Sequence, residues 1–141
     1  MTMIRGVNHI TLAVRDLARS FAFYQAIGCT PLARWSSGAY FRAGKLWLCL
    51  SVDTATRAAP LPEYTHIALD VSAEDFEVAC HRVRNSGATI WKENRSEGPS
   101  LYFLDPDGHK LELHVGDWQS RLAAMKAKPW EPGIDFFDGT P

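Results

Sequence analysis

The stretch HIALDV, residues 66–71, decides the fold, because it repeats HITLAV at residues 9–14. Both stretches are rich in apolar and β-branched residues, which is typical of a strand with at least one buried face. Each is followed by a helical pattern that ends near a glycine, and then by three short strand-like segments. The order strand, helix, strand, strand, strand therefore occurs twice, and the sequence predicts a duplicated module.

The two predicted helices carry matching apolar stripes. Their apolar residues recur at i, i+4 and i+7, which places them on one helix face. Asp16 precedes the first helix and is predicted to act as its N-cap. The second helix is predicted to open with Ser72-Ala73-Glu74-Asp75, which comes close to a capping box although Asp replaces the usual Glu or Gln. The stripes are Leu17, Phe21 and Tyr24 in the first module, and Phe76, Cys80 and Val83 in the second.

Three strand candidates follow each helix. The last two candidates of the second module are joined by Asp105-Pro106-Asp107-Gly108. Proline presets φ for a turn and glycine accepts a positive φ, so this tetrapeptide predicts a hairpin. The predicted strands cover residues 31–35, 39–43 and 45–51 in the first module, and 88–92, 100–104 and 109–115 in the second.

The 141 residues suffice for one domain with a real core, and hardly for two. A helix crossover followed by a meander suits an α+β fold in which a curved mixed sheet carries its helices on one face. We therefore expect a single domain over 1–141. Its parts are module one at about 4–52, a turn-rich linker at about 53–63, module two at about 64–116, and a C-terminal helix with an irregular tail at about 117–141.

Composition excludes several classes of function. The formal net charge of −1 gives no general reason to expect binding to nucleic acid or to a membrane surface. No apolar run approaches the ~20 residues that span a bilayer, and no signal-peptide pattern precedes the first strand. The cysteines, Cys29, Cys49 and Cys80, are odd in number and widely spaced, so reduced and mostly buried thiols are expected. The predicted localisation is cytoplasmic.

Aligning the modules brings chemically matched residues to equivalent positions. His9 and His66 begin equivalent first strands, and Trp47 aligns with Glu112 on the last strands. These four positions are predicted to face one cavity. Two imidazoles and one carboxylate suit Mn²⁺, Fe²⁺, Ni²⁺ or Zn²⁺ better than Ca²⁺, and they leave coordination positions open for a substrate. Trp47 cannot coordinate, so it adds an apolar wall to the predicted site.

Each ligand candidate also has a structural interpretation. A lone histidine in an apolar strand is more often a hydrogen-bonded core residue, and Glu112 taken alone is equally compatible with the solvated face of its strand. The coincidence of these residues at repeat positions favours metal ligation. His114 shares a strand face with Glu112 and is the alternative ligand. His81 and His109 are predicted to be exposed.

A cluster of cations and hydroxyls leads into the predicted hairpin. For WKENRSEG (91–98) a solvated loop is the simpler interpretation. The position of this loop beside a predicted ligand strand instead favours a site for a phosphate, phosphonate or carboxylate. Gly98 adds backbone freedom. The candidate residues are Lys92, Asn94, Arg95, Ser96, Ser100 and Tyr102, with Arg121 further along the chain.

On these residues the chain resembles the vicinal oxygen chelate superfamily, which is built from paired βαβββ modules. It is most similar to the fosfomycin-resistance glutathione transferases of the FosA type. The match runs from about residue 4 to residue 126. It is carried by NHITLAVRDLARSFAFY, ARWSSGAYF, LWLCLS and YTHIAL, and above all by WKENRSEGPSLYFLDPDGHKLELHVGDWQSRLAA (91–124).

The resemblance implies a domain-swapped homodimer. His9 of one subunit would join His66 and Glu112 of the other around Mn²⁺. The substrate would be fosfomycin, a phosphonate that bears an epoxide, and a glutathione thiolate would open the epoxide. Thr11 would hydrogen-bond the epoxide oxygen as a catalytic residue. Other substrate-binding residues would be Lys92, Ser96, Ser100, Tyr102 and Arg121, with Trp47 and Tyr40 on the opposite wall.

The resemblance also implies a potassium site and a thiol channel. K⁺ would act as an activator in a loop that contains Asn94, Ser96, Glu97, Gly98 and Ser100. Trp35, Tyr40 and Cys49 would border the channel for glutathione. Because the thiol of the co-substrate is the nucleophile, no cysteine of the chain needs a catalytic role.

Three other functions compete with this interpretation. A relative that opens fosfomycin with water or with another thiol is the nearest alternative, but the predicted site strands offer no further carboxylate as a base for water. A metal-free dimer that sequesters a drug has no use for the His9, His66 and Glu112 set. A dioxygenase or glyoxalase-type isomerase does not account for the cationic hydroxyl loop.

Overall fold

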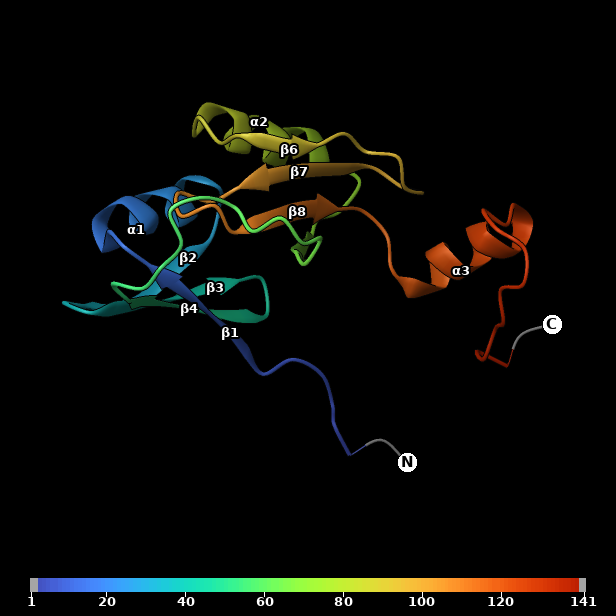
Figure 1. Ribbon diagram of the computed structural model, residues 1–141, viewed down its shortest axis with the longest axis horizontal. Helices are drawn as coiled ribbons and strands as arrows, with labels where there is room; N and C mark the ends of the chain where they lie inside the picture. The colour runs from blue at the N-terminus through green and yellow to red at the C-terminus, as the bar shows by residue number, and fades with distance from the viewer. Residues whose placement is uncertain (1–2, 140–141) are drawn as a thin grey trace.

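Each half of the chain folds into a strand, a helix and three further strands in the computed structural model, which describes residues 3–139 (Figure 1). The predicted α+β class and the twofold βαβββ order are confirmed. The first module contains β1 (His9–Val14), α1 (Leu17–Ala26), β2 (Thr30–Trp35), β3 (Gly38–Ala43) and β4 (Leu46–Val52). The second contains β5 (Ile67–Asp70), α2 (Phe76–Asn85), β6 (Ile90–Lys92), β7 (Ser100–Leu104) and β8 (Lys110–His114), and α3 (Trp118–Ala127) follows.

Each module forms its own mixed sheet of four strands. The strand orders are β1-β4-β3-β2 and β5-β8-β7-β6, which are equivalent in the two modules. In both sheets the first strand runs parallel to the last, and the other neighbours are antiparallel. The register pairs His9 with Trp47 in the first sheet. It pairs Tyr102 with Glu112 in the second. In each sheet the final strand therefore pairs a candidate site residue with a polar or aromatic residue of a neighbouring strand.

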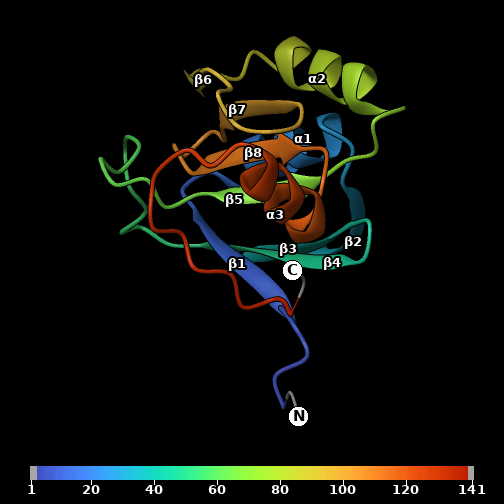
Figure 2. The same ribbon diagram turned by 90° about the vertical axis from the view of Figure 1, so that its right-hand side faces the viewer.

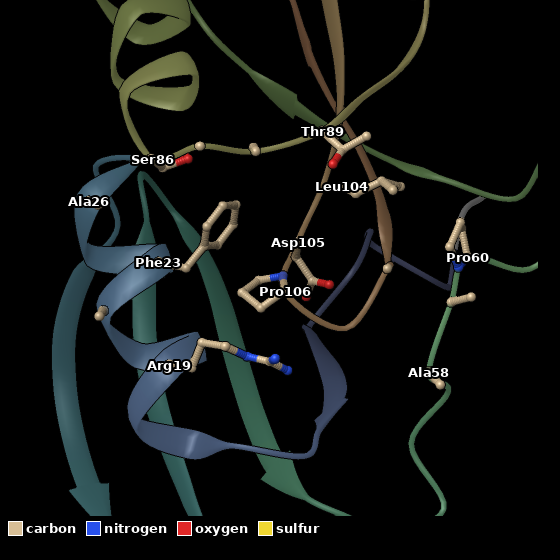
Figure 3. Close-up of a pocket in the computed structure, with 15 residues that line it drawn as sticks. Arg19, Phe23, Ala26, Ala58, Pro60, Ser86, Thr89, Leu104, Asp105 and Pro106 are labelled. Atoms are coloured by element: carbon tan, nitrogen blue, oxygen red, sulfur yellow. The ribbon is translucent and has the colours of Figure 1, made fainter.

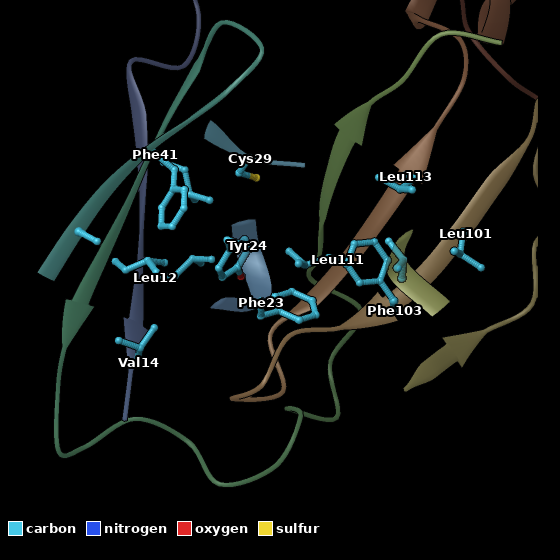
Figure 4. Packing of buried hydrophobic residues seen from close by; sticks show 14 of the residues in the cluster. Leu12, Val14, Phe23, Tyr24, Cys29, Phe41, Leu101, Phe103, Leu111 and Leu113 are labelled. Atoms are coloured by element: carbon cyan, nitrogen blue, oxygen red, sulfur yellow. The ribbon is translucent and has the colours of Figure 1, made fainter. Parts of the chain in front are cut away.

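A single hydrophobic core joins the two sheets through α1 (Figure 4). The helix begins where predicted, because the side chain of Asp16 accepts a hydrogen bond from the backbone N–H of Arg19. Phe23 and Tyr24 lie between the sheets. The Tyr24 ring packs 6.2 Å from Phe41 of β3, and the Phe23 ring packs 6.3 Å from Phe103 of β7. The sheet faces that meet the helices are therefore apolar, and the opposite faces are left for polar side chains.

The predicted hairpin turn at residues 105–108 ties the second module to the first. Asp105 and Asp107 are buried, and both carboxylates accept hydrogen bonds from the first module. The hydroxyl of Tyr24 donates to Asp105 at 2.7 Å, and the backbone N–H of Arg15 donates to Asp107 at 3.1 Å. His109, which follows the turn, donates from Nε2 to the backbone carbonyl of Ala13 at 2.8 Å.

The predicted exposure of His109 is therefore wrong, whereas His81 on α2 is exposed as expected. His109 is buried because the hairpin turn is inserted between the modules, where an imidazole can satisfy a β1 carbonyl. The predicted strand at 64–71 is also shorter than expected and begins at Ile67. His66 therefore lies immediately before β5, and its ring donates a hydrogen bond to the carbonyl of Tyr64.

The C-terminal helix α3 lies beyond the end of β8 in Figure 1, and in Figure 2, which views the molecule from that side, α3 stands in front of the two sheets. It starts with a capping box between Asp117 and Ser120 and buries none of its residues. The tail after it contains no helix or strand as far as residue 139, and residues 1–2 and 140–141 of the predicted domain lie outside the described residues. Among residues 3–139, no helix has the length and apolar character needed to cross a membrane.

Candidate functional site

The predicted site residues that belong to strands lie on the sheet faces that point away from the helices. On the first sheet, His9 and Trp47 are neighbours in register, and their ring centroids are 4.6 Å apart. The ring of Tyr40 packs 5.2 Å from Trp47 and 4.8 Å from Trp35. Thr11 is paired with Cys49 on the same face. This face presents an exposed histidine above a continuous aromatic wall.

The ring of His9 is already oriented by a neighbour. Its Nδ1 lies 2.7 Å from the amide oxygen of Asn8, which can only accept a hydrogen bond. Nδ1 of His9 is therefore the protonated nitrogen, and Nε2 carries the lone pair. A hydrogen bond from one ring nitrogen commonly orients a histidine that binds a metal through its other nitrogen.

On the second sheet, Glu112 lies at the centre of the site face and is only 5% exposed. One of its oxygens, Oε1, lies 3.0 Å from Nε2 of His66. Nδ1 of His66 donates to the carbonyl of Tyr64 at 2.9 Å, so Nε2 of a neutral His66 carries a lone pair. When His66 is neutral, two acceptor atoms face each other at 3.0 Å, and a cation bound by both removes their repulsion, whereas a protonated His66 forms an ion pair with Glu112. These two atoms, Nε2 of His66 and Oε1 of Glu112, each offer a lone pair to a metal, and this donor pair fits a divalent metal ion.

A single chain brings together only two of the three predicted ligands. His66 and Glu112 are in contact, whereas His9 belongs to the other sheet. Within residues 3–139, no group of three or more His, Cys, Asp or Glu side chains is arranged to hold a metal ion. His114, the alternative ligand, contacts the other oxygen of Glu112, with Nδ1 3.5 Å from Oε2.

Three of the predicted anion-binding residues share the face of Glu112. Tyr102 is paired in register with Glu112 and with Lys92, and Ser100 is paired with His114. The ammonium of Lys92 donates to the hydroxyl of Tyr64 and lies 4.8 Å from the centroid of the Tyr102 ring. The hydrogen bond to Tyr64 raises the pKa of Lys92, so this side chain remains a cation near the donor pair.

The predicted potassium loop is a turn closed by its own side chains. Asn94 donates from its amide nitrogen to the carbonyl of Gly98 at 2.9 Å, and its amide oxygen accepts from the backbone N–H and the hydroxyl of Ser96. Gly98 has a φ of 80°, and a Cβ there would lie 2.6 Å from the carbonyl oxygen of Val115. Only glycine therefore fits this position.

Arg121 reaches the loop from α3. Its Nε lies 3.3 Å from Oε2 of Glu97, and its Nη2 lies 3.5 Å from Nε2 of His114. The loop, Arg121 and the end of β8 therefore form one continuous polar surface beside Glu112. The carboxylate of Glu97 is engaged by Arg121 and does not point at the His66 and Glu112 pair.

Tyr64 and Asn8 are contributors that sequence reasoning missed. The backbone carbonyl of Tyr64 orients His66, and its hydroxyl accepts from Lys92. The amide oxygen of Asn8 likewise accepts a hydrogen bond from Nδ1 of His9 and orients its ring. Their positions just before each predicted ligand are the only signal in the sequence, because polar residues next to a ligand are available to hold its second nitrogen.

The cysteines are uninvolved in any polar contact of the site. All three are free and buried, as predicted. Burial raises the pKa of Cys29 to about 11, so this thiol is a poor nucleophile at neutral pH.

A pocket of about 610 Å³ lies elsewhere, between α1, the linker and the hairpin turn (Figure 3). It is lined mainly by small side chains, with Arg19 at one side, Ala58 and Pro60 at the other, and Asp105 and Pro106 between them. None of the predicted site residues lines it, so the pocket is separate from the candidate site.

The model of the Glyoxalase/Bleomycin resistance protein/Dioxygenase superfamily matches residues 6–113. The glutathione transferase FosA of Serratia marcescens is 53% identical over 131 residues, covering 91% of this chain and 93% of the relative. The metallothiol transferase FosB of Staphylococcus haemolyticus is 39% identical, covering 90% of this chain and 96% of the relative.

A solved structure of the fosfomycin resistance protein FosX from Listeria monocytogenes superimposes with a TM-score of 0.73 at 33% identity, covering 86% of this chain and 98% of that one. That structure is of a mutant in which one glutamate is replaced by glutamine, in complex with Mn(II) and 1S,2S-dihydroxypropylphosphonic acid. The chain belongs to the Glyoxalase/Bleomycin resistance protein/Dioxygenase superfamily and, within it, to the group that contains FosA, FosB and FosX.

Proposed function

We propose that this protein is a Mn²⁺-dependent glutathione transferase that inactivates fosfomycin by opening its epoxide. The observation that carries the proposal is the contact of Nε2 of His66 with Oε1 of Glu112 at 3.0 Å, beside the ammonium of Lys92. This juxtaposition suits a divalent metal next to a bound anion. The similarity to FosA, a glutathione transferase, supports the choice of thiol.

The complete site forms between two copies of the chain in this proposal. His9 of one copy meets His66 and Glu112 of the other and supplies the third ligand. Two features of the single chain support the pairing. The face that carries His9 exposes Trp35, Tyr40 and Trp47, which are large side chains rarely left to solvent in one patch. Strands β1 and β5 are also unpaired sheet edges among the described residues.

The side chains of the site would bind the phosphonate and orient the epoxide. Lys92 and Arg121 neutralise the phosphonate charge, which otherwise repels an incoming thiolate. Ser96 and Tyr102 donate hydrogen bonds to its oxygens, Ser100 lines the phosphonate site, and Thr11 donates to the epoxide oxygen. Bound Mn²⁺ supplies a Lewis acid for the negative charge that develops on this oxygen.

The chemical step is a displacement at carbon. The glutathione sulfur forms a bond to the carbon that bears the phosphonate, from the face opposite the epoxide C–O bond. That C–O bond breaks, its electron pair stays on oxygen, and a proton from solvent completes the hydroxyl of the thioether product. Trp35, Tyr40 and Cys49 line the approach of glutathione on the aromatic wall.

Two further assignments belong to the same proposal. Potassium acts as an activator in the loop of Asn94, Ser96, Glu97, Gly98 and Ser100, and the compact turn made by Asn94 and Gly98 supports this by gathering oxygen atoms in one place. The protein works in the cytoplasm, where glutathione is abundant and where three free cysteines stay reduced.

One incubation series tests the proposed function. The protein is mixed with fosfomycin and Mn²⁺, with and without glutathione, and the products are identified by phosphorus NMR. A thioether that forms only with glutathione is the expected result. A vicinal diol formed without thiol would instead indicate hydrolysis, and unchanged fosfomycin bound at one per site would indicate sequestration. Replacing glutathione by another low-molecular-weight thiol distinguishes a transferase of different thiol specificity.

A further inference from the structure

We propose that His114 is a positioning residue that holds the metal ligand Glu112 in place through the hydroxyl of Ser100. The proposal rests on the proposed metal site but not on the identity of the substrate. His114 is not itself a ligand in this account. It sets the geometry of one carboxylate oxygen so that the other is free to face His66.

The contacts form a directional chain of hydrogen bonds. The Oγ of Ser100 lies 2.6 Å from Oε2 of Glu112 and 2.6 Å from Nδ1 of His114. A serine hydroxyl has one proton, and an ionised carboxylate can only accept. Ser100 therefore donates a hydrogen bond to Glu112, and its oxygen accepts a hydrogen bond from Nδ1–H of His114.

The far side of the His114 ring agrees with this assignment. With the proton on Nδ1, Nε2 carries the lone pair of a neutral imidazole. Nη2 of Arg121 lies 3.5 Å from this nitrogen and is a donor without acceptor capacity. In the series of hydrogen bonds from Arg121 through His114 and Ser100 to Glu112, each donor therefore points its proton towards the carboxylate.

The backbone leaves a slot that fits the imidazole. A Cβ at Gly98 would lie 3.3 Å from Cε1 of His114, and a Cβ at Gly116 would lie 3.3 Å from its Nε2. Both glycines have a positive φ, so the chain approaches the ring from two sides where other residues are disfavoured. The His114 side chain is only 15% exposed. Its ring is held by packing as well as by hydrogen bonds.

The consequence falls on the metal ligand. With Oε2 of Glu112 held by Ser100, the carboxylate presents Oε1 towards Nε2 of His66. Outer-sphere partners that orient a ligating carboxylate contribute to metal affinity, and their loss commonly costs about 10- to 100-fold. His114 should therefore affect Mn²⁺ binding although it does not bind the metal.

Three substitutions at one position test the inference. In His114→Asn the amide nitrogen can take the place of Nδ1, whereas in His114→Gln it can take the place of Nε2. His114→Ala removes both. The dissociation constant of Mn²⁺ is measured by electron paramagnetic resonance of the free ion, and thermal unfolding checks that each variant is folded. We expect His114→Asn to stay within about threefold of the wild type, and the other two to bind about tenfold more weakly.

A double-mutant cycle with Ser100→Ala completes the test. Because His114 acts through Ser100, adding His114→Ala to Ser100→Ala should weaken Mn²⁺ binding no further. The inference is overturned if the two losses add, if His114→Ala binds Mn²⁺ as the wild type does, or if His114→Asn and His114→Gln lose affinity equally. The last result would also fit direct ligation by His114. Failure of the wild type to make a thioether would reject the proposed function and leave these affinities interpretable.

Discussion

At the scale of residues, the site depends on which atoms accept and which donate. His66 is held by Tyr64 so that its free nitrogen faces Glu112, and Glu112 is held by Ser100 on its other side. The repeat in the sequence predicted Glu112 as the important glutamate. It could not predict the hydrogen bonds around it, because Ser100 reaches Glu112 from β7, and the register of β7 and β8 is set only by folding.

Replacing Glu112 by glutamine should remove most of the activity and weaken Mn²⁺ binding by at least about tenfold, because the amide is neutral and a poor ligand. Glu97→Gln is the matched control, since Glu97 contacts Arg121 and not His66. Calorimetric titration of Mn²⁺ into both variants compares them directly. Wild-type affinity in Glu112→Gln would remove Glu112 from the ligand set.

Lys92→Ala should raise the KM for fosfomycin by about tenfold or more, because a charge-assisted contact to the phosphonate contributes roughly 1.5–3 kcal/mol. Its Mn²⁺ affinity should change little, because its contacts are to Tyr64 and Tyr102 and not to the donor pair. Lys128→Ala, an exposed lysine after α3, controls for the loss of a positive charge. Equal losses of fosfomycin use and metal affinity in Lys92→Ala would mean that Lys92 supports the metal ligands instead.

At the scale of elements, the β7–β8 hairpin has two roles. Its strands present Ser100, Tyr102 and Glu112, and its turn inserts Asp105, Asp107 and His109 between the modules. The tetrapeptide at 105–108 was sufficient to predict the turn. The burial of His109 was not predictable, because it results from β1, which is about a hundred residues away in sequence and supplies the carbonyl of Ala13.

Tyr24→Phe should destabilise the fold by about 1–3 kcal/mol, because the buried carboxylate of Asp105 loses a hydrogen-bond donor. Urea unfolding measures the difference. Tyr40→Phe provides the control, since Tyr40 is exposed on the aromatic wall and its loss of a hydroxyl leaves no buried group without a partner. Equal stability of Tyr24→Phe and the wild type would show that the hairpin turn does not depend on this contact.

At the scale of the whole molecule, the two sheets explain why one chain does not complete the site. The alignment of the modules matched His9 with His66 and Trp47 with Glu112, and in the structure His9 pairs with Trp47 in one sheet while Glu112 lies on the strand that pairs with β5 in the other. Equivalence in a repeat does not bring two residues together, however, and in this chain His9 and His66 flank separate sheets. In the proposed function a second copy completes the site, and this expectation came from the family resemblance and not from the residue pattern alone.

The most direct test of the account mixes inactive variants. His9→Ala and Glu112→Ala proteins are each inactive in this account, and unfolding and refolding them together should regenerate one intact site per mixed dimer, with activity of about one quarter of the wild type. His66→Ala mixed with Glu112→Ala is the matched control and should remain inactive, because His66 and Glu112 belong to the same half-site. Recovery of thioether formation in the first mixture and not in the second is the predicted result. No recovery in the first mixture, with dimers shown to exchange, would contradict a site shared between two chains.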